Sequence, residues 1–268
     1  MKVLVLGSSG VIGRSLSIHL KNIGHEVIDW DIQIDPSHDL SNPENKKNLK
    51  NVINSVDFVY FLAYDVGGSK YLSSTHNNFI NNNLMIMINT FDCLKNKKFI
   101  FASSQMQNMY NAYGALKQIG EHYTHNMGGI STRFWNIYGP ELFSEKSHVI
   151  PDFIHNFKTN GKIELLTDGT EERQFLYTTD CAKCLTVIMN KYDEIYKERK
   201  CIDISCFKWK TIMDVARMIA PEDVISSSEC KDITQTIRNE PDTFILKYWK
   251  PEIDLKVGID YMIHGTYN

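Results

Sequence analysis

The chain has 268 residues, of which 43% are hydrophobic, and carries a formal net charge of -3 with a pI of about 6.3. This charge gives no sign of a nucleic-acid or membrane-surface partner, and no apolar run approaches the roughly 20 residues of a membrane span. The length suits one large α/β unit with a smaller second lobe. Six scattered cysteines and no signal peptide favour reduced thiols and a cytoplasmic protein. Cys181-x-x-Cys184 has no second pair beside it, so we expect core packing on a helix and no metal site.

The N-terminal segment predicts a strand, a glycine turn and a helix. Residues 2–6 form a short apolar run, typical of a strand covered on both faces in a parallel sheet. A helix with Leu16 and Leu20 on its apolar side follows the turn. Glycines there let the backbone approach a pyrophosphate, whose charge the helix N-terminus meets, whereas the alternative is an ordinary βα turn. The predicted dinucleotide contacts are Gly7, Ser9, Gly10, Val11, Ile12 and Gly13.

A second strand, predicted at 27–30, ends at Asp31. A carboxylate at this point accepts both hydroxyls of an adenosine ribose and would repel a 2′-phosphate. Since no Arg or Lys follows among the next three residues, NAD is favoured over NADP. A helix is expected at 45–54 and a third strand at 57–62. Further cofactor contacts are expected from Asp39 and Leu40 near the adenine, and from Leu62, Ala63 and Tyr64 after the third strand.

Tyr113 and Lys117 lie four residues apart on a helix predicted at 112–126, which follows a buried strand at 99–102. Side chains at this spacing project from one face, so the ammonium can lie close to the phenol and favour its ionised form. A phenol that loses its proton near neutral pH can take the proton of an alcohol while a hydride leaves the same carbon. Such a pair also arises often by chance on an exposed helix.

The chain resembles the extended short-chain dehydrogenase/reductase superfamily, in its nucleotide-sugar epimerase/dehydratase branch. The matching pieces, in order, are GSSGVIG, Asp31, HDL, DFVYFLA, SS, YGALK, RFWNIYGPE, GTEERQFLYTTD and YWKP. The resemblance covers nearly the whole chain and implies an NAD(P)-binding Rossmann fold, a doubly wound parallel sheet. It places the cofactor domain at residues 1–135 with a returning segment around 176–205. The remaining residues, 136–175 and 206–268, would form a small C-terminal lobe that binds a nucleoside-diphosphate sugar.

The resemblance also implies the catalytic roles. Tyr113 is the expected base, and Lys117 is its activator and a ligand of the nicotinamide ribose. Ser104 is expected to hold the substrate hydroxyl, with Ser103 as the nearby alternative. Asn83, on a helix predicted at 75–94, is expected on the cofactor side, where it would support the active-site backbone.

Substrate contacts are implied at Gly67, Gly68, Gln105 and Asn136, besides Ser104 and Tyr113. For Gly67-Gly68 a flexible loop is an equal alternative. Arg173 is expected to bind the diphosphate, a task suited to a planar fork of donors, and Arg238 is a second candidate.

Other polar residues are expected to be structural. Arg133 is predicted to be a strand residue with a structural partner, and Asp180 a helix cap. His148 and His155 flank or lie in a helix predicted at 149–156 and are expected to be surface histidines.

Two departures from the family pattern narrow the expected activity. Ser104 and Tyr113 are only nine positions apart, so a loop near the sugar is trimmed. Gln105 and Met106 stand where sugar dehydratases have an acidic pair, and neither exchanges a proton, which disfavours elimination of water. Met106 also replaces the cysteine of a 3,5-epimerase, which disfavours that activity.

The expected function is NAD-dependent epimerisation of a nucleotide sugar at C4 through a transient 4-keto intermediate. The alternatives are an NAD(P)H-dependent 4-ketoreductase of a 4-keto-6-deoxy nucleotide sugar and a non-catalytic NAD-binding protein of the same fold. The resemblance also implies a homodimer that pairs the helices at 75–94 and 112–126.

Overall fold

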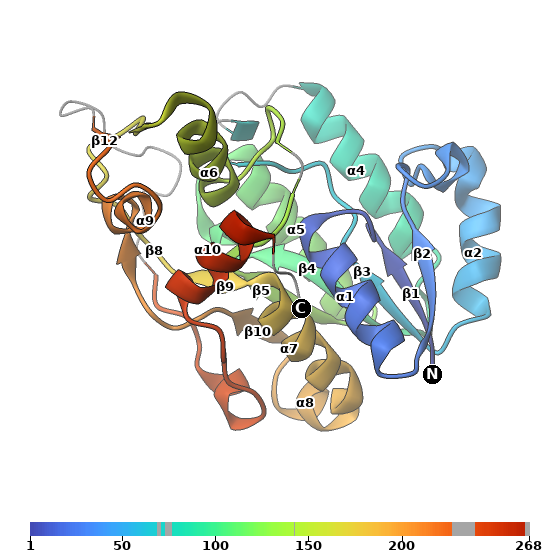
Figure 1. Ribbon diagram of the computed structural model, residues 1–268. Coiled ribbons are helices and arrows are strands. Elements are labelled where there is room, and N and C mark those ends of the chain that lie inside the picture. The colour runs from blue at the N-terminus through green and yellow to red at the C-terminus, as the bar shows by residue number, and fades with distance from the viewer. Residues whose placement is uncertain (69–70, 73–76, 142, 227–238, 266–268) are drawn as a thin grey trace.

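The computed structural model describes residues 1–68, 71–72, 77–141, 143–226 and 239–265. A six-stranded parallel sheet runs through the larger part, with helices on both of its faces (Figure 1). Its order is β10 (Cys201–Ile204), β5 (Ile130–Phe134), β4 (Lys98–Ser104), β3 (Phe58–Phe61), β1 (Lys2–Leu6) and β2 (Glu26–Trp30). The expected doubly wound parallel sheet is confirmed.

Two apolar cores flank the sheet, because successive side chains of a strand point to opposite faces. Val3 and Val5 of β1 pack beneath α1 (Val11–Asn22) and α7 (Thr178–Asn190). Leu4 and Leu6 face the other layer, which consists of α2 (Lys46–Asn54), α4 (Asn77–Phe91) and α5 (Ala112–Asn126). Burial on both faces explains the unbroken apolar run of β1.

The predicted elements agree with the observed ones to within two residues at most ends. β1 and α5 have the predicted bounds, and the strands predicted at 27–30, 57–62 and 99–102 are β2, β3 and β4. The helix predicted at 75–94 is observed as α4, which ends at Phe91, and its first predicted residues lie outside the described ranges. The helix predicted at 149–156 extends to Asn160 in α6 (Val149–Asn160), where Gly161 in the left-handed conformation ends it.

A third core, beyond the carboxyl edge of the sheet, holds the lobe together. Here Ile154 of α6, Val215 of α9 (Ile212–Ile219) and Ile259 of α10 (Leu255–His264) pack together. Three short strand pairs border it, namely β6 (Asn136–Tyr138) with β9 (Phe175–Tyr177), β8 (Glu172–Arg173) with β11 (Lys210–Thr211), and β7 (Ile163–Glu164) with β12 (Val224–Ile225). The segment Phe244–Lys247 instead packs Phe244 and Ile245 into the core beneath α7, and α8 (Tyr192–Glu198) covers the same face.

Asp180 connects distant parts of the chain. It lies in the first turn of α7, whose N-cap is Tyr177, so the prediction of a helix cap was wrong. Its Oδ2 accepts the backbone N–H groups of Glu252 and Ile253 at 2.8 and 2.7 Å. Asp180 therefore holds the segment before α10 against α7. Cys181 and Cys184 are buried in the core on α7, as predicted.

Candidate active site

A cavity of about 1890 Å³ opens at the carboxyl ends of β1, β3 and β4 and extends to the lobe. It lies where the strand order reverses between β1 and β3, the position at which open α/β sheets bind ligands. Pockets for one drug-sized molecule measure roughly 300–1,000 Å³, so this cavity has room for two ligands. Its wall contains most of the predicted site residues, namely Gly7, Ser9, Gly10, Val11, Ile12, Gly13, Asp31, Asp39, Leu40, Leu62, Ala63, Tyr64, Gly67, Gly68, Ser104, Gln105, Tyr113, Lys117, Asn136 and Arg173.

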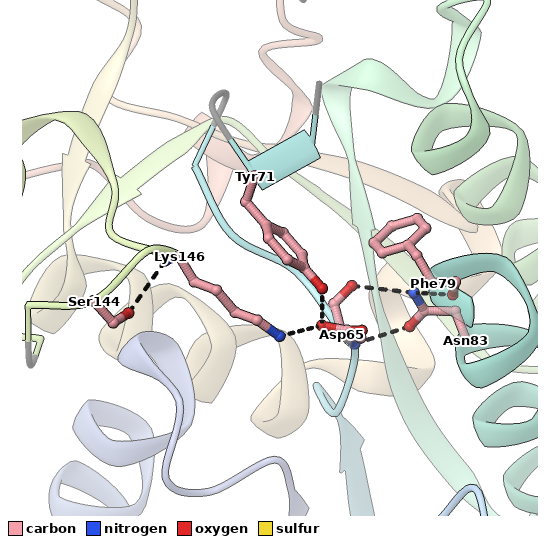
Figure 2. Close-up of polar contacts among 6 residues, drawn as sticks. All are labelled: Asp65, Tyr71, Phe79, Asn83, Ser144 and Lys146. Carbon is pink, nitrogen blue, oxygen red and sulfur yellow. Dashed lines mark hydrogen bonds and ion pairs between the residues drawn. The ribbon is translucent and has the colours of Figure 1, made fainter. Parts of the chain in front are cut away.

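Of the predicted site residues that the structure describes, Asn83 does not line this wall. Asn83 is fully buried, accepts the N–H of Asp65 at 2.8 Å and donates to the carbonyls of Asp65 and Phe79 at 3.1 and 3.0 Å (Figure 2). It supports the backbone of the loop after β3 and has no place in the cavity wall formed by the described residues. Arg238 lies outside the described residues.

The glycine turn is built so that the chain passes close to itself. Gly7 has φ 87°, and a Cβ there would stand 2.6 Å from the Ala63 nitrogen. A Cβ on Gly13 would stand 2.1 Å from the Gly7 carbonyl oxygen. A Cβ on Gly10 would meet that same oxygen at 3.4 Å and nothing else within 4 Å among the described residues. The turn is therefore closed on its inner side and open at Gly10 toward the cavity.

The open side of the turn coincides with the beginning of α1. Gly10, its N-cap, has no side chain to cap the amides of the first turn, which lack carbonyl partners within the helix. Such amides, together with the helix dipole, favour a phosphate group. These residues fit the pyrophosphate of a dinucleotide.

Asp31 is held in a fixed orientation beside this turn. Its Oδ2 accepts the N–H of Ser9 at 3.0 Å, and its Oδ1 accepts the N–H of Gln33 at 2.9 Å. The His38 ring stacks on Trp30 at 4.0 Å and covers the end of β2. A fixed carboxylate in the cavity wall fits the ribose hydroxyls of NAD.

Tyr113 and Lys117 meet the end of β4. α5 begins behind Asn111, whose side chain accepts the N–H of Gly114 at 2.7 Å and caps the helix. The Lys117 Nζ donates to the Ala102 carbonyl at 2.7 Å and lies 5.6 Å from the centre of the Tyr113 ring. It also lies 3.4 Å from the centre of the Tyr64 ring, where the negative face of the ring attracts a cation.

Burial dominates the ionisation of this pair. Burial raises the pKa of Tyr113 to about 12, although its hydrogen bond with Ser104 lowers it. Burial also lowers the pKa of Lys117 well below its ordinary value, while the Glu121 carboxylate raises it. The expected phenol with a pKa near neutrality is therefore not produced by the chain alone, because the charged forms of both groups lose their hydration.

A polar cluster that the sequence did not indicate closes one side of the cavity. Lys146 Nζ and the Tyr71 hydroxyl donate to Oδ1 of Asp65 at 2.5 and 2.9 Å (Figure 2). The backbone N–H of Lys146 donates to Oγ of Ser144 at 3.2 Å. The ion pair between Asp65 and Lys146 joins the loop after β3 to the loop before α6. Its partners lie 81 residues apart, so no sequence spacing signals it.

Gly67 and Gly68 pack against the same lobe loop. The Gly68 N–H donates to the Lys146 carbonyl at 3.0 Å, and a Cβ on Gly68 would stand 2.4 Å from the Ser147 carbonyl oxygen. A Cβ on Gly67 would stand 3.0 Å from the Lys146 oxygen. The double glycine is therefore a packed contact across the cavity.

Four buried polar atoms of the cavity wall find no hydrogen-bond partner among the described residues. They are the Tyr64 hydroxyl, Trp135 Nε1, Asn136 Oδ1 and Glu171 Oε2. Buried polar groups are nearly always paired in folded proteins, so these atoms indicate a polar ligand. Arg173, which is 8% exposed, stands in the same wall and donates from Nη1 to the Glu172 carbonyl at 2.7 Å.

His148 has a hydrogen-bonded and partly exposed side chain at the beginning of α6. It lies in the cavity wall, and its Nδ1 is 2.8 Å from Oε2 of Glu141, whose Oε1 accepts the His148 backbone N–H at 2.6 Å. The side chain is 39% exposed, which agrees with the expected surface histidine, but the sequence did not indicate its pairing with Glu141 at the cavity. His155 stacks on Phe143 at 3.7 Å.

Other features bear on metals, thiols and membranes. Among the described residues there is no group of three or more His, Cys, Asp or Glu side chains that could hold a metal ion. The cysteines of this part of the chain are free thiols, namely Cys93, Cys181, Cys184, Cys201 and Cys206. Its helices are all too short or too polar to cross a membrane.

Comparisons with known proteins agree with this architecture. The sequence pattern of the NAD dependent epimerase/dehydratase family matches residues 3–202. A GDP-mannose 3,5-epimerase 1 from Oryza sativa is 27% identical over 225 residues, which are 68% of this chain and 60% of the relative. The chain thus spans about 60% of that relative's length. A putative UDP-glucose 4-epimerase from Methanocaldococcus jannaschii is 24% identical over 99% of this chain and 98% of the relative.

A similar solved structure shows the same fold. A GDP-6-OMe-4-keto-L-xylo-heptose reductase from C. jejuni superposes with a TM-score of 0.84 at 21% identity, covering 99% of this chain and 97% of that one. The family pattern covers more than half of the chain, and the glycine turn with Asp31 fits NAD, the cofactor of that family. This chain therefore belongs to the NAD dependent epimerase/dehydratase family, a branch of the extended short-chain dehydrogenases/reductases.

Proposed function

We propose that this enzyme epimerises a nucleotide sugar at C4 through a transient 4-keto intermediate. One observation carries the proposal: Ser104, Tyr113 and Lys117 share one end of the cavity with Gln105 and Met106, whose side chains exchange no proton. The chain thus supplies a base for the proton of a sugar hydroxyl there, without the acidic pair that elimination of water requires. The missing acid favours an epimerase or a reductase over a dehydratase.

In the proposed mechanism the chain's own residues handle the proton and the orientation of the sugar. Tyr113 takes the proton of the C4 hydroxyl and later returns it to the oxygen of the product. Ser104 bonds the same hydroxyl, and the charge of Lys117 stabilises the phenolate of Tyr113. NAD held by the glycine turn, Asp31 and Lys117 would supply reversible hydride acceptance at C4. The cavity volume leaves the keto sugar room to turn.

The ligand contacts are part of the same proposal. NAD would lie on the glycine turn with its ribose on Asp31, its adenine near Asp39 and Leu40, and its nicotinamide ribose on Lys117. The sugar nucleotide would lie against the lobe, with its diphosphate on Arg173 and its sugar near Gly67-Gly68, Gln105 and Asn136. The unpaired Asn136 Oδ1 and the buried Arg173 support this side of the cavity as the substrate side.

A second candidate is epimerisation at C3 or C5, next to the keto carbon. The Glu141–His148 pair favours it, because an imidazole held by a carboxylate can remove and return a carbon-bound proton. The similarity to a GDP-mannose 3,5-epimerase points the same way. Met106, at the position of the expected cysteine, weighs against this activity.

Incubation with a panel of UDP-, GDP- and dTDP-sugars in D₂O, without added cofactor, separates these reactions by NMR. Epimerisation at C4 by hydride return gives an isomer that carries no solvent deuterium on carbon. Epimerisation at C3 or C5 incorporates deuterium at that carbon. A parallel incubation contains 4-keto sugars and added NADH or NADPH. Turnover in that incubation alone, with consumption of the reduced cofactor, would refute the epimerase and establish a 4-ketoreductase.

We further propose that the enzyme is a cytoplasmic homodimer with the cofactor domain at residues 1–135 and around 176–205, and the lobe at 136–175 and 206–268. Large apolar side chains that are 36–43% exposed lie on the neighbouring helices α4 and α5, namely Met85, Ile88, Ile119 and Tyr123. They support a dimer through this face. We expect Ile119→Glu to give a monomer by light scattering and the control Ile225→Glu to leave a dimer.

A further inference from the structure

Glu121 is a buried carboxylate that the proposed mechanism does not use. It is 6% exposed and lies on α5, one turn beyond Lys117 and two turns beyond Tyr113. Residues four apart on a helix share a face, so these three side chains form one row along α5. The row faces the carboxyl end of β4.

Each member of the row contacts a different residue of β4. Tyr113 forms a hydrogen bond with Ser104, and Lys117 donates to the Ala102 carbonyl at 2.7 Å. Glu121 accepts the Ser103 hydroxyl on Oε1 at 2.6 Å. These contacts fix β4 and α5 relative to each other at the residues proposed for the chemistry.

Glu121 is itself held rigidly from the other side. Arg133 of β5 donates to Oε1 through Nε and to Oε2 through Nη2, both at 2.8 Å. Such a bidentate pair fixes the plane of the carboxylate. The Cys201 thiol lies 3.9 Å from Oε1.

The ammonium of Lys117 needs stabilisation because it is 3% exposed. The Tyr64, Phe101 and Tyr113 rings lie 3.4, 5.2 and 5.6 Å from its Nζ, measured to the ring centres. A buried cation without a compensating negative charge releases its proton. Glu121 is the charged group that raises the pKa of Lys117 in this environment.

We propose that Glu121 is a positioning residue for catalysis, which holds Ser103 at the end of β4 against α5 and places a buried negative charge one helical turn from Lys117. The inference rests on the proposed function only in so far as Lys117 activates Tyr113. A plain structural ion pair between Glu121 and Arg133 is the competing explanation, and it leaves the charge of Lys117 unaffected.

The test measures the ionisation of Lys117 directly. Protein labelled with ¹³C at the lysine ε carbons is titrated by NMR, and the signal absent from Lys117→Arg identifies Lys117. In Glu121→Gln, which keeps the shape of the side chain, we expect the pKa of Lys117 to fall by about one unit. We expect the alkaline limb of the kcat profile to move to lower pH by the same amount.

Matched controls separate charge from structure. Ser103→Ala removes one bond of Glu121 but keeps its charge, so the pKa of Lys117 should stay within error of the parent. Lys256 and Asp260 are an exposed pair with the same four-residue spacing as Lys117 and Glu121. Asp260→Asn should change neither the signal of Lys117 nor the kcat profile. Glu121→Asp keeps the negative charge, so the pKa of Lys117 in this variant should lie closer to the parental value than to the value in Glu121→Gln.

Should Glu121→Gln fail to fold because Arg133 is left unpaired, the double variant Glu121→Gln with Arg133→Gln removes both partners of that pair. We expect the pKa of Lys117 to be lower in this double variant than in Arg133→Gln alone, because the two proteins differ only in the carboxylate. An unchanged pKa of Lys117 in whichever of these variants folds, with or without a uniform loss of activity, would overturn the proposal. The NMR titration needs no substrate, so failure to turn over any nucleotide sugar would count against the proposed function and not against this inference.

Discussion

Replacing Gly10 by alanine tests whether the beginning of α1 is the pyrophosphate site. Gly10 has φ -68° and ψ 168°, a conformation that alanine adopts without strain. The added Cβ would meet the Gly7 carbonyl oxygen at 3.4 Å, so the fold has space for it. Because alanine has less freedom than glycine in the unfolded chain, we expect the apoprotein to gain about 0.5 kcal/mol of stability.

The same Cβ points to the open side of the turn, where a phosphate would approach. We therefore expect Gly10→Ala to weaken NAD binding at least tenfold, which is about 1.4 kcal/mol. Urea denaturation of the apoprotein and calorimetric titration with NAD measure the two effects separately. Gly13→Ala should instead destabilise the apoprotein by about 3 kcal/mol, because its Cβ would overlap the Gly7 carbonyl oxygen at 2.1 Å.

Gly24→Ala is the matched control for Gly10→Ala. Gly24 has φ 87° and open space around a Cβ among the described residues, so alanine there should cost about 1 kcal/mol of stability and leave NAD affinity unchanged. Parental NAD affinity in Gly10→Ala would show that the cofactor does not contact this turn. Unfolding of Gly10→Ala would show that the turn is not open as described.

Three further predictions concern the proton-transfer residue, cofactor choice and pH. Tyr113→Phe should lower turnover by about 10²–10⁴-fold while the protein keeps its NAD, as measured by product formation and by cofactor content. Parental turnover in this variant would show that Tyr113 does not transfer the proton. Asp31→Asn should lower the ratio of NAD to NADP affinity by about tenfold, since the repulsion of a 2′-phosphate is lost, and an unchanged ratio in a binding titration would place the ribose elsewhere. Burial lowers the pKa of His125 in the folded chain. Between that folded pKa and the unfolded value of about 6.5, the unfolded chain binds a proton that the folded chain does not. Stability should therefore fall as the pH drops from 7 through this range. Urea denaturation of the parent and His125→Asn at pH 7.5 and 5.5 should show a smaller loss in the variant, and equal losses would contradict the assignment.

The sequence predicted those features whose causes are local. The strand, turn and helix of residues 2–22 follow from an apolar run and three glycines, and the bounds of α5 follow from its amphipathic pattern around Tyr113 and Lys117. A Cβ on Gly13 or Gly7 would stand 2.1 or 2.6 Å from backbone atoms, so only glycine fits at these positions. This requirement explains why the fingerprint can be recognised without a structure.

Features that depend on partners far away in the chain could not be predicted. Asp65 meets Lys146 from 81 residues away, and Asp180 binds the backbone of Glu252 at a separation of 72. His148 and Glu141 are only seven residues apart, but an irregular turn of the lobe loop brings them together, so no regular spacing predicts the pair. The raised pKa of Tyr113 is likewise a result of burial, which the spacing of Tyr113 and Lys117 does not reveal.

The most direct test of the account is mass spectrometry of the small molecules released by denaturing the purified enzyme, before and after incubation with the nucleotide-sugar panel without added cofactor. We predict that NAD is released in the same amount from both samples while an isomer differing at C4 accumulates. A sample that releases no cofactor and turns over only 4-keto sugars with consumption of added NADH or NADPH would contradict the account.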